Sequence, residues 1–135
     1  MPLLVDTGIL FALADRSDRW HARTRAYLES AHETLLAPVT IVPEVAYLLR
    51  ERIGVRAELT FTRSIADGEL AIQDIGQPEW ERAEELMATY EFLGLVDATV
   101  VAVAERLKVR VIATTDRRHF GAVRPAHTDT FALVP

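Results

Sequence analysis

The chain has 135 residues, the length of one average domain, and half of them are hydrophobic, enough to cover a sheet on both faces. It contains no cysteine, which excludes disulfides and thiolate metal sites, so any metal bound here is a hard cation with oxygen ligands. The net charge of −5 argues against a general nucleic-acid coat but does not exclude a nuclease. Because we find no signal-like segment and no apolar stretch of membrane-spanning length, we expect a soluble, cytoplasmic protein.

Short apolar segments alternate with helix-like segments along the whole chain. The predicted strands cover residues 2–5, 35–37, 70–72, 109–113 and 130–134. The predicted helices cover residues 7–14, 18–30, 41–53, 55–66, 77–93 and 98–107. This alternation predicts an α/β fold over residues 1–135, a single domain whose parallel sheet is flanked by helices on both faces (α/β/α).

Local sequence signals predict the first residues or the buried face of three of these helices. Thr40 is predicted to be the N-cap of helix 41–53, whose first turn tolerates Pro43. Helix 98–107 is apolar nearly all round, as is typical of a buried helix, and we expect Asp97 to start it. The predicted inner face of helix 77–93 consists of Trp80, Ala83, Met87 and Tyr90, with Leu93 as a further candidate.

Four acidic residues stand at predicted strand ends or helix starts, namely Asp6, Glu44, Asp97 and Asp116. In parallel α/β sheets, ligands bind at the carboxyl ends of the strands, and the helices begin at that same edge. We therefore expect the four carboxylates to converge, and carboxylates so close together cannot all ionise without a cation. One or two Mg²⁺ or Mn²⁺ ions would remove the conflict and could hold the attacking water and leaving oxygen of a phosphodiester.

Each acid also has a purely structural interpretation. Asp6 and Asp97 could be helix N-caps, and Asp116 could form an Asx-turn. Glu44 could be an exposed acid that interacts favourably with a helix dipole. The joint placement of all four at one edge favours the metal site.

The segments that carry these acids resemble the motifs of a known family. LLVDTGILFALAD, PEVAYLL, GLVDATVVAVAERL and IATTDRRHF are similar, in order and spacing, to the four motifs of PIN-domain ribonucleases. The similarity is strongest to the VapC toxins of bacterial VapBC toxin–antitoxin pairs. It covers nearly the whole chain.

The resemblance implies that the metal-binding and catalytic residues are Asp6, Glu44, Asp97 and Asp116. It also implies that Thr7 and Thr114 support the site. Thr115 fills a middle position of the last motif where the family more often has an apolar residue. Some relatives carry a further acid after the third motif; Thr99 and Val100 offer none, which implies weak binding of a second metal.

The function implied by the resemblance is Mg²⁺- or Mn²⁺-dependent hydrolysis of structured RNA, such as tRNA or rRNA, which arrests growth and leaves 5′-phosphate ends. The implied partners are a second copy in a homodimer and a VapB-type antitoxin whose C-terminal tail blocks the metal site. Arg117, Arg118 and His119 follow the last acid and could hold RNA phosphates, or they could form a solvated turn that Phe120 anchors in the core.

Two other functions fit parts of the pattern. Asp6 ends the first strand, as the nucleophile of haloacid-dehalogenase-like phosphotransferases does, but those enzymes place a second aspartate two residues later, where Gly8 stands. The second alternative is a PIN-like scaffold that binds protein or RNA without cutting it. The four intact acids argue against a scaffold.

Overall fold

The structure, a computed structural model, describes residues 2–135. Its strands are β1 (Leu3–Val5), β2 (Leu35–Pro38), β3 (Leu70–Gln73), β4 (Val111–Ala113) and β5 (Ala132–Val134). Its helices are α1 (Thr7–Ala14), α2 (His21–Ser30), α3 (Ile41–Arg52), α4 (Val55–Ala66), α5 (Gln77–Thr89), α6 (Leu95–Leu107) and α7 (Arg117–Ala122). The strands form one parallel sheet in the order β3-β2-β1-β4-β5.

The central strand β1 is short and entirely buried. Leu4 pairs with Leu36 of β2 on one side and with Ile112 of β4 on the other. A parallel sheet needs cover on both faces, which explains why its middle strands are runs of apolar residues rather than alternating patterns. Because all strands run the same way, β1 and β4 deliver the residues that follow them, including Asp6 and Asp116, to the same edge.

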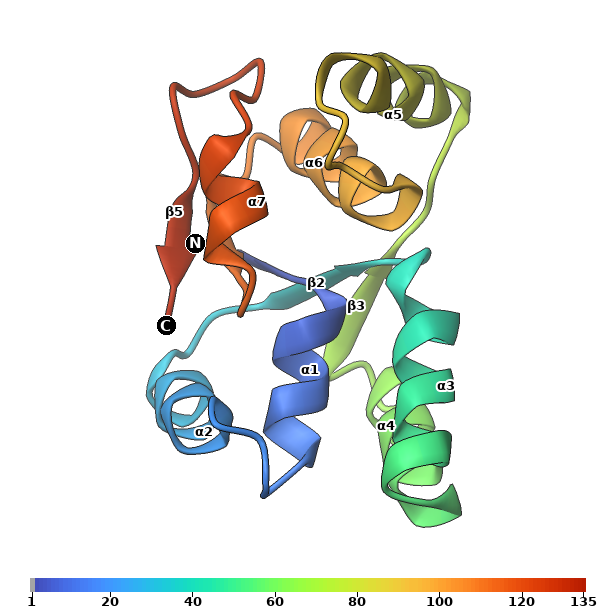
Figure 1. The fold of residues 1–135 in the computed structure, drawn as a ribbon. Helices are drawn as coiled ribbons and strands as arrows, with labels where there is room; N and C mark the ends of the chain where they lie inside the picture. The colour runs from blue at the N-terminus through green and yellow to red at the C-terminus, as the bar shows by residue number, and fades with distance from the viewer. Residues whose placement is uncertain (1) are drawn as a thin grey trace.

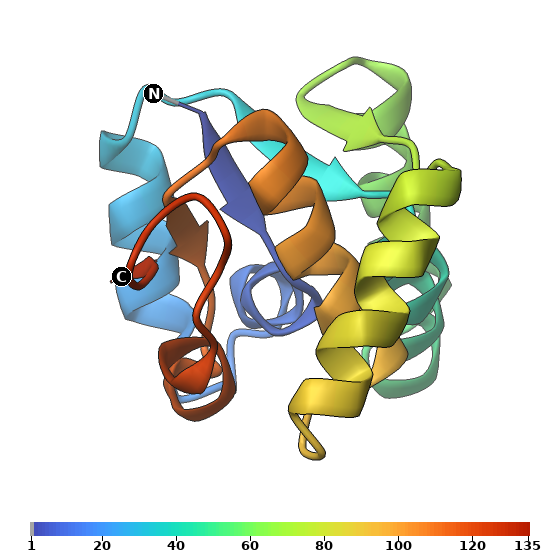
Figure 2. The ribbon, with the colours of Figure 1, turned by 90° about the horizontal axis from the view of Figure 1, so that it is seen from above.

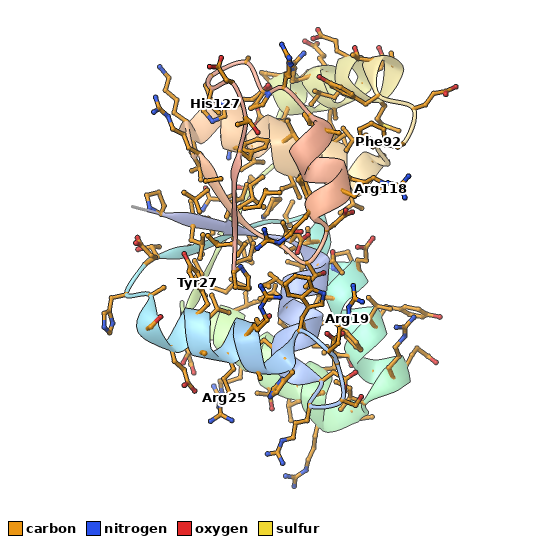
Figure 3. All side chains as sticks on the ribbon, turned by 60° about the vertical axis from the view of Figure 1, so that its left-hand side comes forward. Arg19, Arg25, Tyr27, Phe92, Arg118 and His127 are labelled. Atoms are coloured by element: carbon orange, nitrogen blue, oxygen red, sulfur yellow. The ribbon has the colours of Figure 1, made fainter. Side chains whose placement is uncertain are left out.

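Helices cover both faces of the sheet, as predicted for an α/β/α fold (Figure 1). Helices α1 to α4 lie on one side, α5 and α6 lie on the other, and α7 packs beside β5. Seen from above, α6 crosses the middle of the sheet with α5 next to it (Figure 2). On α2, Tyr27 points toward the sheet and Arg25 away from it (Figure 3).

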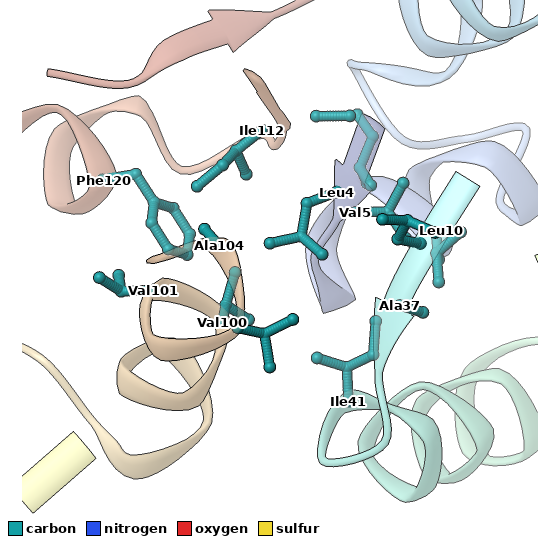
Figure 4. Close-up of a cluster of buried hydrophobic side chains, with 14 of the residues drawn as sticks. Leu4, Val5, Leu10, Ala37, Ile41, Val100, Val101, Ala104, Ile112 and Phe120 are labelled. Atoms are coloured by element: carbon teal, nitrogen blue, oxygen red, sulfur yellow. The ribbon is translucent and has the colours of Figure 1, made fainter. Parts of the chain in front are cut away.

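Helix α6 lies at the centre of the core. Its residues 98–104 are all buried, which confirms the prediction made from its apolar composition. Val100 lies on the side of Leu4, and Val101 lies beside Phe120 of α7, which closes the cluster (Figure 4). Phe120 is fully buried, so it fixes the short helix that follows Asp116.

One predicted helix start and one predicted capping hydrogen bond differ from the structure. Helix α6 begins at Leu95, and Gly94 is its N-cap, so Asp97 lies within the first turn and does not cap it. Thr40 has helical backbone angles and makes no capping hydrogen bond. Its hydroxyl instead contacts the hydroxyl of Thr99 at 2.6 Å, a tertiary contact that joins α3 to α6 and that local sequence signals do not reveal.

The predicted inner face of α5 is also only partly correct. Ala83 is buried, but Trp80 and Met87 are exposed, and Leu86 takes the inner position instead. The helix ends at Thr89, earlier than predicted. None of the helices within residues 2–135 combines the length and the hydropathy that a membrane span requires.

Candidate metal centre

Asp6 lies directly after β1 and is almost completely buried, with 4% of its surface exposed. Its Oδ1 accepts a hydrogen bond from the backbone N–H of Ile9 at 3.0 Å, so Asp6 is the N-cap of α1. Its Oδ2 accepts a hydrogen bond from the Thr114 hydroxyl. Burial raises the pKa of Asp6 to about 7, despite the opposing effect of these hydrogen bonds. Burial therefore disfavours the charged form of Asp6, and a cation close by would stabilise it.

Asp97 and Asp116 face each other together with His119. One ligand atom from each of these three residues lies within 4.8 Å of the other two. His119 stands one helical turn after Asp116, so its Nδ1 lies 2.9 Å from Asp116 Oδ2. The other oxygen of Asp116 accepts the backbone N–H of His119 at 3.0 Å and caps α7. Three potential ligands therefore come from only two short segments.

The acids perturb one another electrostatically. The pKa of Asp97 is raised to about 6, first by burial and then by the negative charges of Asp116 and Glu44. Asp97 and Asp116 also raise the pKa of Asp6, to a smaller extent than burial does. The edge of the sheet therefore concentrates negative charge that a divalent cation would stabilise.

Glu44 takes the outermost position among the four predicted acids. It lies in the first turn of α3, as predicted, and its side chain is exposed. Its charge acts on Asp97, but its carboxylate is not part of the three-residue group of Asp97, Asp116 and His119. Asp6 also lies outside that group and is linked to it through Thr114 and through its electrostatic effect.

The two predicted supporting threonines occupy different environments. Thr114 is fully buried, and its hydroxyl accepts the backbone N–H of Asp116 at 2.8 Å while donating to Asp6. The Thr7 hydroxyl is buried and has no hydrogen-bond partner among residues 2–135. An unpaired buried hydroxyl is uncommon, and here it stands next to the carboxylate of Asp6 in the chain. The carboxylates and this hydroxyl form a donor set that suits a divalent cation with a preference for oxygen ligands.

Two residues of the site could not be identified as such from the sequence. His119 was expected only as a possible RNA contact, although its spacing of three residues from Asp116 on a helix was the available signal. Gly8 allows α1 to approach the loop after β4, since a Cβ atom there would lie 2.5 Å from Thr115 Oγ1. That proximity exists only in the folded chain.

The basic residues after Asp116 point in different directions. The Arg117 guanidinium donates to the carbonyl oxygen of Pro135 and lies 5.9 Å from the centre of the Trp20 ring. Arg118 is exposed and, within residues 2–135, has neither an ion-pair nor a hydrogen-bond partner. Phe120 anchors the segment, as one interpretation of the sequence expected. Arg118 is therefore the cation that remains available to a phosphate.

Residues 3–124 match the family model of the PIN domain. The chain belongs to the PIN-domain family. This PIN domain is 34% identical to ribonuclease VapC26 of Mycobacterium tuberculosis, across 98% of this chain and 100% of that relative. The resemblance to VapC proteins predicted from the four motifs is thereby confirmed.

Solved structures share the fold of this PIN domain. VapC20 of Mycobacterium tuberculosis, described as a sarcin-ricin loop cleaving toxin, matches with a TM-score of 0.76 and 21% identity over 82% of this chain and 86% of that one. A toxin–antitoxin complex from Klebsiella pneumoniae matches with a TM-score of 0.71 and 23% identity over 90% and 92% of the two chains. At these identities the likeness establishes the fold, and the site must be argued from its own residues.

Proposed function

We propose that this PIN domain, taken as one domain over residues 1–135, is a metal-dependent endoribonuclease toxin of the VapC type. One observation carries the proposal: Asp6, Asp97 and Asp116 converge at the carboxyl edge of the sheet, where burial and mutual repulsion keep two of them from ionising freely. Such an arrangement is unfavourable without a cation and suits a catalytic metal site. The identity to a named ribonuclease supports RNA as the substrate class.

We assign each residue of the site a role from its position. Asp97 and Asp116 would hold the metal, with Asp6, Glu44 and Thr7 completing its surroundings. A bound Mg²⁺ or Mn²⁺ ion would neutralise the charge on the phosphodiester and lower the pKa of the attacking water. Thr114 fixes Asp6 relative to Asp116, and this fixed geometry is what positions a reacting phosphate. The expected products carry 5′-phosphate and 3′-hydroxyl ends.

The substrate we propose is structured cellular RNA, tRNA or rRNA, cut in the cytoplasm to arrest growth. The proposed partners are a second copy of the chain and a VapB-type antitoxin. An apolar groove of about 490 Å³ between α1 and α4 offers the antitoxin a docking surface, and it includes Leu10, Leu13 and Phe61. That one structural relative is a toxin–antitoxin complex supports this partner class.

The phosphotransfer alternative has less support. Both carboxylate oxygens of Asp6 accept hydrogen bonds from the protein, and the residue is almost completely buried, which is unsuited to a nucleophile that must reach a phosphate. The non-cleaving scaffold remains the alternative that experiment must separate from the ribonuclease.

Induced expression of the wild type beside Asp6→Asn tests the proposal, with total RNA mapped for new 5′-phosphate ends. Asp67→Asn is the matched control, because Asp67 is an exposed aspartate at the end of α4, away from the site. We expect growth arrest and discrete new ends with the wild type and Asp67→Asn, and neither with Asp6→Asn. Cleavage by Asp6→Asn at the wild-type rate would refute the site, and arrest without new ends would favour the scaffold.

A further inference from the structure

A row of aromatic rings borders the acidic edge of the sheet. The rings of Phe92 and His119 are nearly parallel, with centroids 5.1 Å apart and an interplanar angle of 21°. Tyr90 continues the row at 5.7 Å from Phe92, and its hydroxyl accepts the backbone N–H of Arg124 at 3.0 Å. The Tyr90 ring is tilted by 53° from the Phe92 ring, so the stacked pair is Phe92 with His119. Two segments far apart in the sequence, the α5–α6 connection and α7, therefore build one aromatic surface.

Phe92 is the exposed end of this surface. Its side chain is 42% exposed, although burying it would be favourable. With Arg118, His119 and Ala122 it lines a hollow of about 190 Å³. Phe92 and Arg118 lie on the same side of the molecule (Figure 3). The hollow thus combines a partly exposed aromatic ring with an arginine that has no ion-pair or hydrogen-bond partner within residues 2–135.

The hollow adjoins the candidate metal centre through a shared residue. His119 stacks on Phe92 with its ring and also lies within 4.8 Å of ligand atoms of Asp97 and Asp116. A phosphodiester held at these acids would therefore place a neighbouring nucleotide beside Phe92. An aromatic face next to a free cation is the combination that binds unpaired nucleotides, because the ring stacks on the base and the cation contacts the phosphate.

We propose that Phe92 determines where this protein cuts RNA, by stacking on one unpaired base next to the scissile phosphate while Arg118 holds the adjoining phosphate. The proposal rests on the ribonuclease function proposed above and adds a specificity residue to it. Every base has a flat face, so the platform selects unpaired nucleotides over paired ones rather than one base over another. It directs the metal centre to loops and bulges of a folded RNA.

Three substitutions separate stacking from simple packing. Phe92→Ala removes the ring, Phe92→Leu keeps the apolar volume without a flat face, and Phe92→Tyr keeps the face. Trp80→Ala is the matched control, since Trp80 is an aromatic residue of similar exposure (40%) at the other end of α5. If Phe92 only packed against its neighbours, Leu would replace it as well as Tyr does.

Binding is measured without metal, using short single-stranded RNAs that each carry one 2-aminopurine, whose fluorescence is quenched when it stacks. We expect quenching by the wild type, Phe92→Tyr and Trp80→Ala, and its loss in Phe92→Ala and Phe92→Leu. Unchanged quenching in Phe92→Ala overturns the proposal. Because no cleavage occurs here, this result does not depend on the ribonuclease activity.

Cleavage is then measured with Mg²⁺ on the cellular RNA that yields the mapped 5′-phosphate ends. We expect Phe92→Ala and Phe92→Leu to lower kcat/KM by about ten- to a hundredfold and to spread the cuts over more positions, while Phe92→Tyr cuts as the wild type does. Wild-type rate and positions in Phe92→Ala overturn the proposal, and weakened antitoxin binding by that variant would then assign Phe92 to a protein contact. A wild type that quenches but never cuts would instead refute the ribonuclease and leave the base platform standing.

Discussion

The hydroxyl of Thr114 links two distant segments of the chain at the site. It donates a hydrogen bond to Asp6, which follows β1, and accepts one from the backbone of Asp116, which follows β4. A buried hydroxyl that is satisfied in both roles has a fixed orientation. One side chain therefore holds Asp6 and Asp116, the first and the last of the four predicted site acids, in a constant relation. This constancy is the preorganisation that a metal centre requires.

The raised pKa values of Asp6 and Asp97 predict how the stability of the protein depends on pH. In the folded, metal-free protein Asp6 keeps its proton up to about pH 7 and Asp97 up to about pH 6, whereas an unfolded aspartate loses its proton near the ordinary pKa of 3.8. Between these values the folded state binds more protons than the unfolded state. The contribution of both groups to the free energy of unfolding is therefore complete below pH 3.8 and is lost as pH rises to about 7.

Urea unfolding at a series of pH values, in EDTA and in Mg²⁺, measures this effect. We expect the wild type without metal to lose stability as pH rises through the window, and Asp6→Asn, which cannot ionise there, to lose less. Added Mg²⁺ should stabilise the wild type most above pH 7, where both carboxylates carry their charges. Equal pH dependence in the wild type and Asp6→Asn would contradict the assignment of the proton to Asp6.

At the scale of elements, the start of α1 packs tightly against the loop that follows β4. Alanine is favoured over glycine within a helix by about 1 kcal/mol, so Gly8 in α1 is not there for helix stability. A Cβ atom at this position would lie 2.5 Å from Thr115 Oγ1. Gly8 is therefore explained by the close approach of the two segments that carry Asp6 and Asp116.

This packing predicts that the effect of Gly8→Ala depends on residue 115. In the wild-type background we expect Gly8→Ala to leave the stability unchanged or to lower it, because the clash with Thr115 offsets the gain in helix propensity. In a Thr115→Ala background the clashing oxygen is absent, so Gly8→Ala should stabilise the protein by about 1 kcal/mol. Thermal or urea unfolding of the four proteins gives the interaction energy, which we expect to be about 1–2 kcal/mol. If Gly8→Ala changes the free energy of unfolding equally in both backgrounds, residue 8 and the side chain of Thr115 are not in steric conflict.

Helices α5 and α6 are joined by polar contacts as well as by apolar packing. Arg82 of α5 donates to both carboxylate oxygens of Glu105 in α6, at 2.7 and 3.0 Å. Glu105 also accepts the backbone N–H of Ala126 at 2.7 Å. A second ion pair joins Glu79 to Arg106. These contacts join the start of α5 to the end of α6, at the end of the helix pair opposite the connection that carries Phe92.

For the whole molecule, much of the architecture could be predicted from the sequence because its signals are local. Alternating strands and helices predict a parallel sheet, and the run of small apolar residues in α6 predicts its burial. The strands that precede Asp6 and Asp116 place these acids at one edge as a consequence of parallel pairing alone. The convergence of Asp6 and Asp116 thus follows from the order of elements.

The remaining features arise from contacts between distant segments. The hydroxyl of Thr40 could cap α3, but in the fold it contacts Thr99, which no local pattern encodes. Helix periodicity is compatible with an inner face of α5 that contains Trp80 or with one that contains Leu86. The packing of α5 on α6 buries Leu86 and leaves Trp80 exposed. The stacking of Phe92 on His119 joins two segments whose proximity is set by the tertiary fold.

If the acidic edge of the sheet cuts RNA with the help of a divalent cation, cleavage must depend on both the metal and the acids. The most direct test is incubation of the purified protein, freed of any antitoxin, with total RNA in Mg²⁺ or EDTA, beside Asp97→Asn and the control Asp67→Asn. We expect discrete cuts with 5′-phosphate ends only when metal is present, with Asp97→Asn slower by about a hundredfold or more and Asp67→Asn unchanged. Cleavage that persists in EDTA, or that proceeds at the wild-type rate in Asp97→Asn, would contradict this expectation.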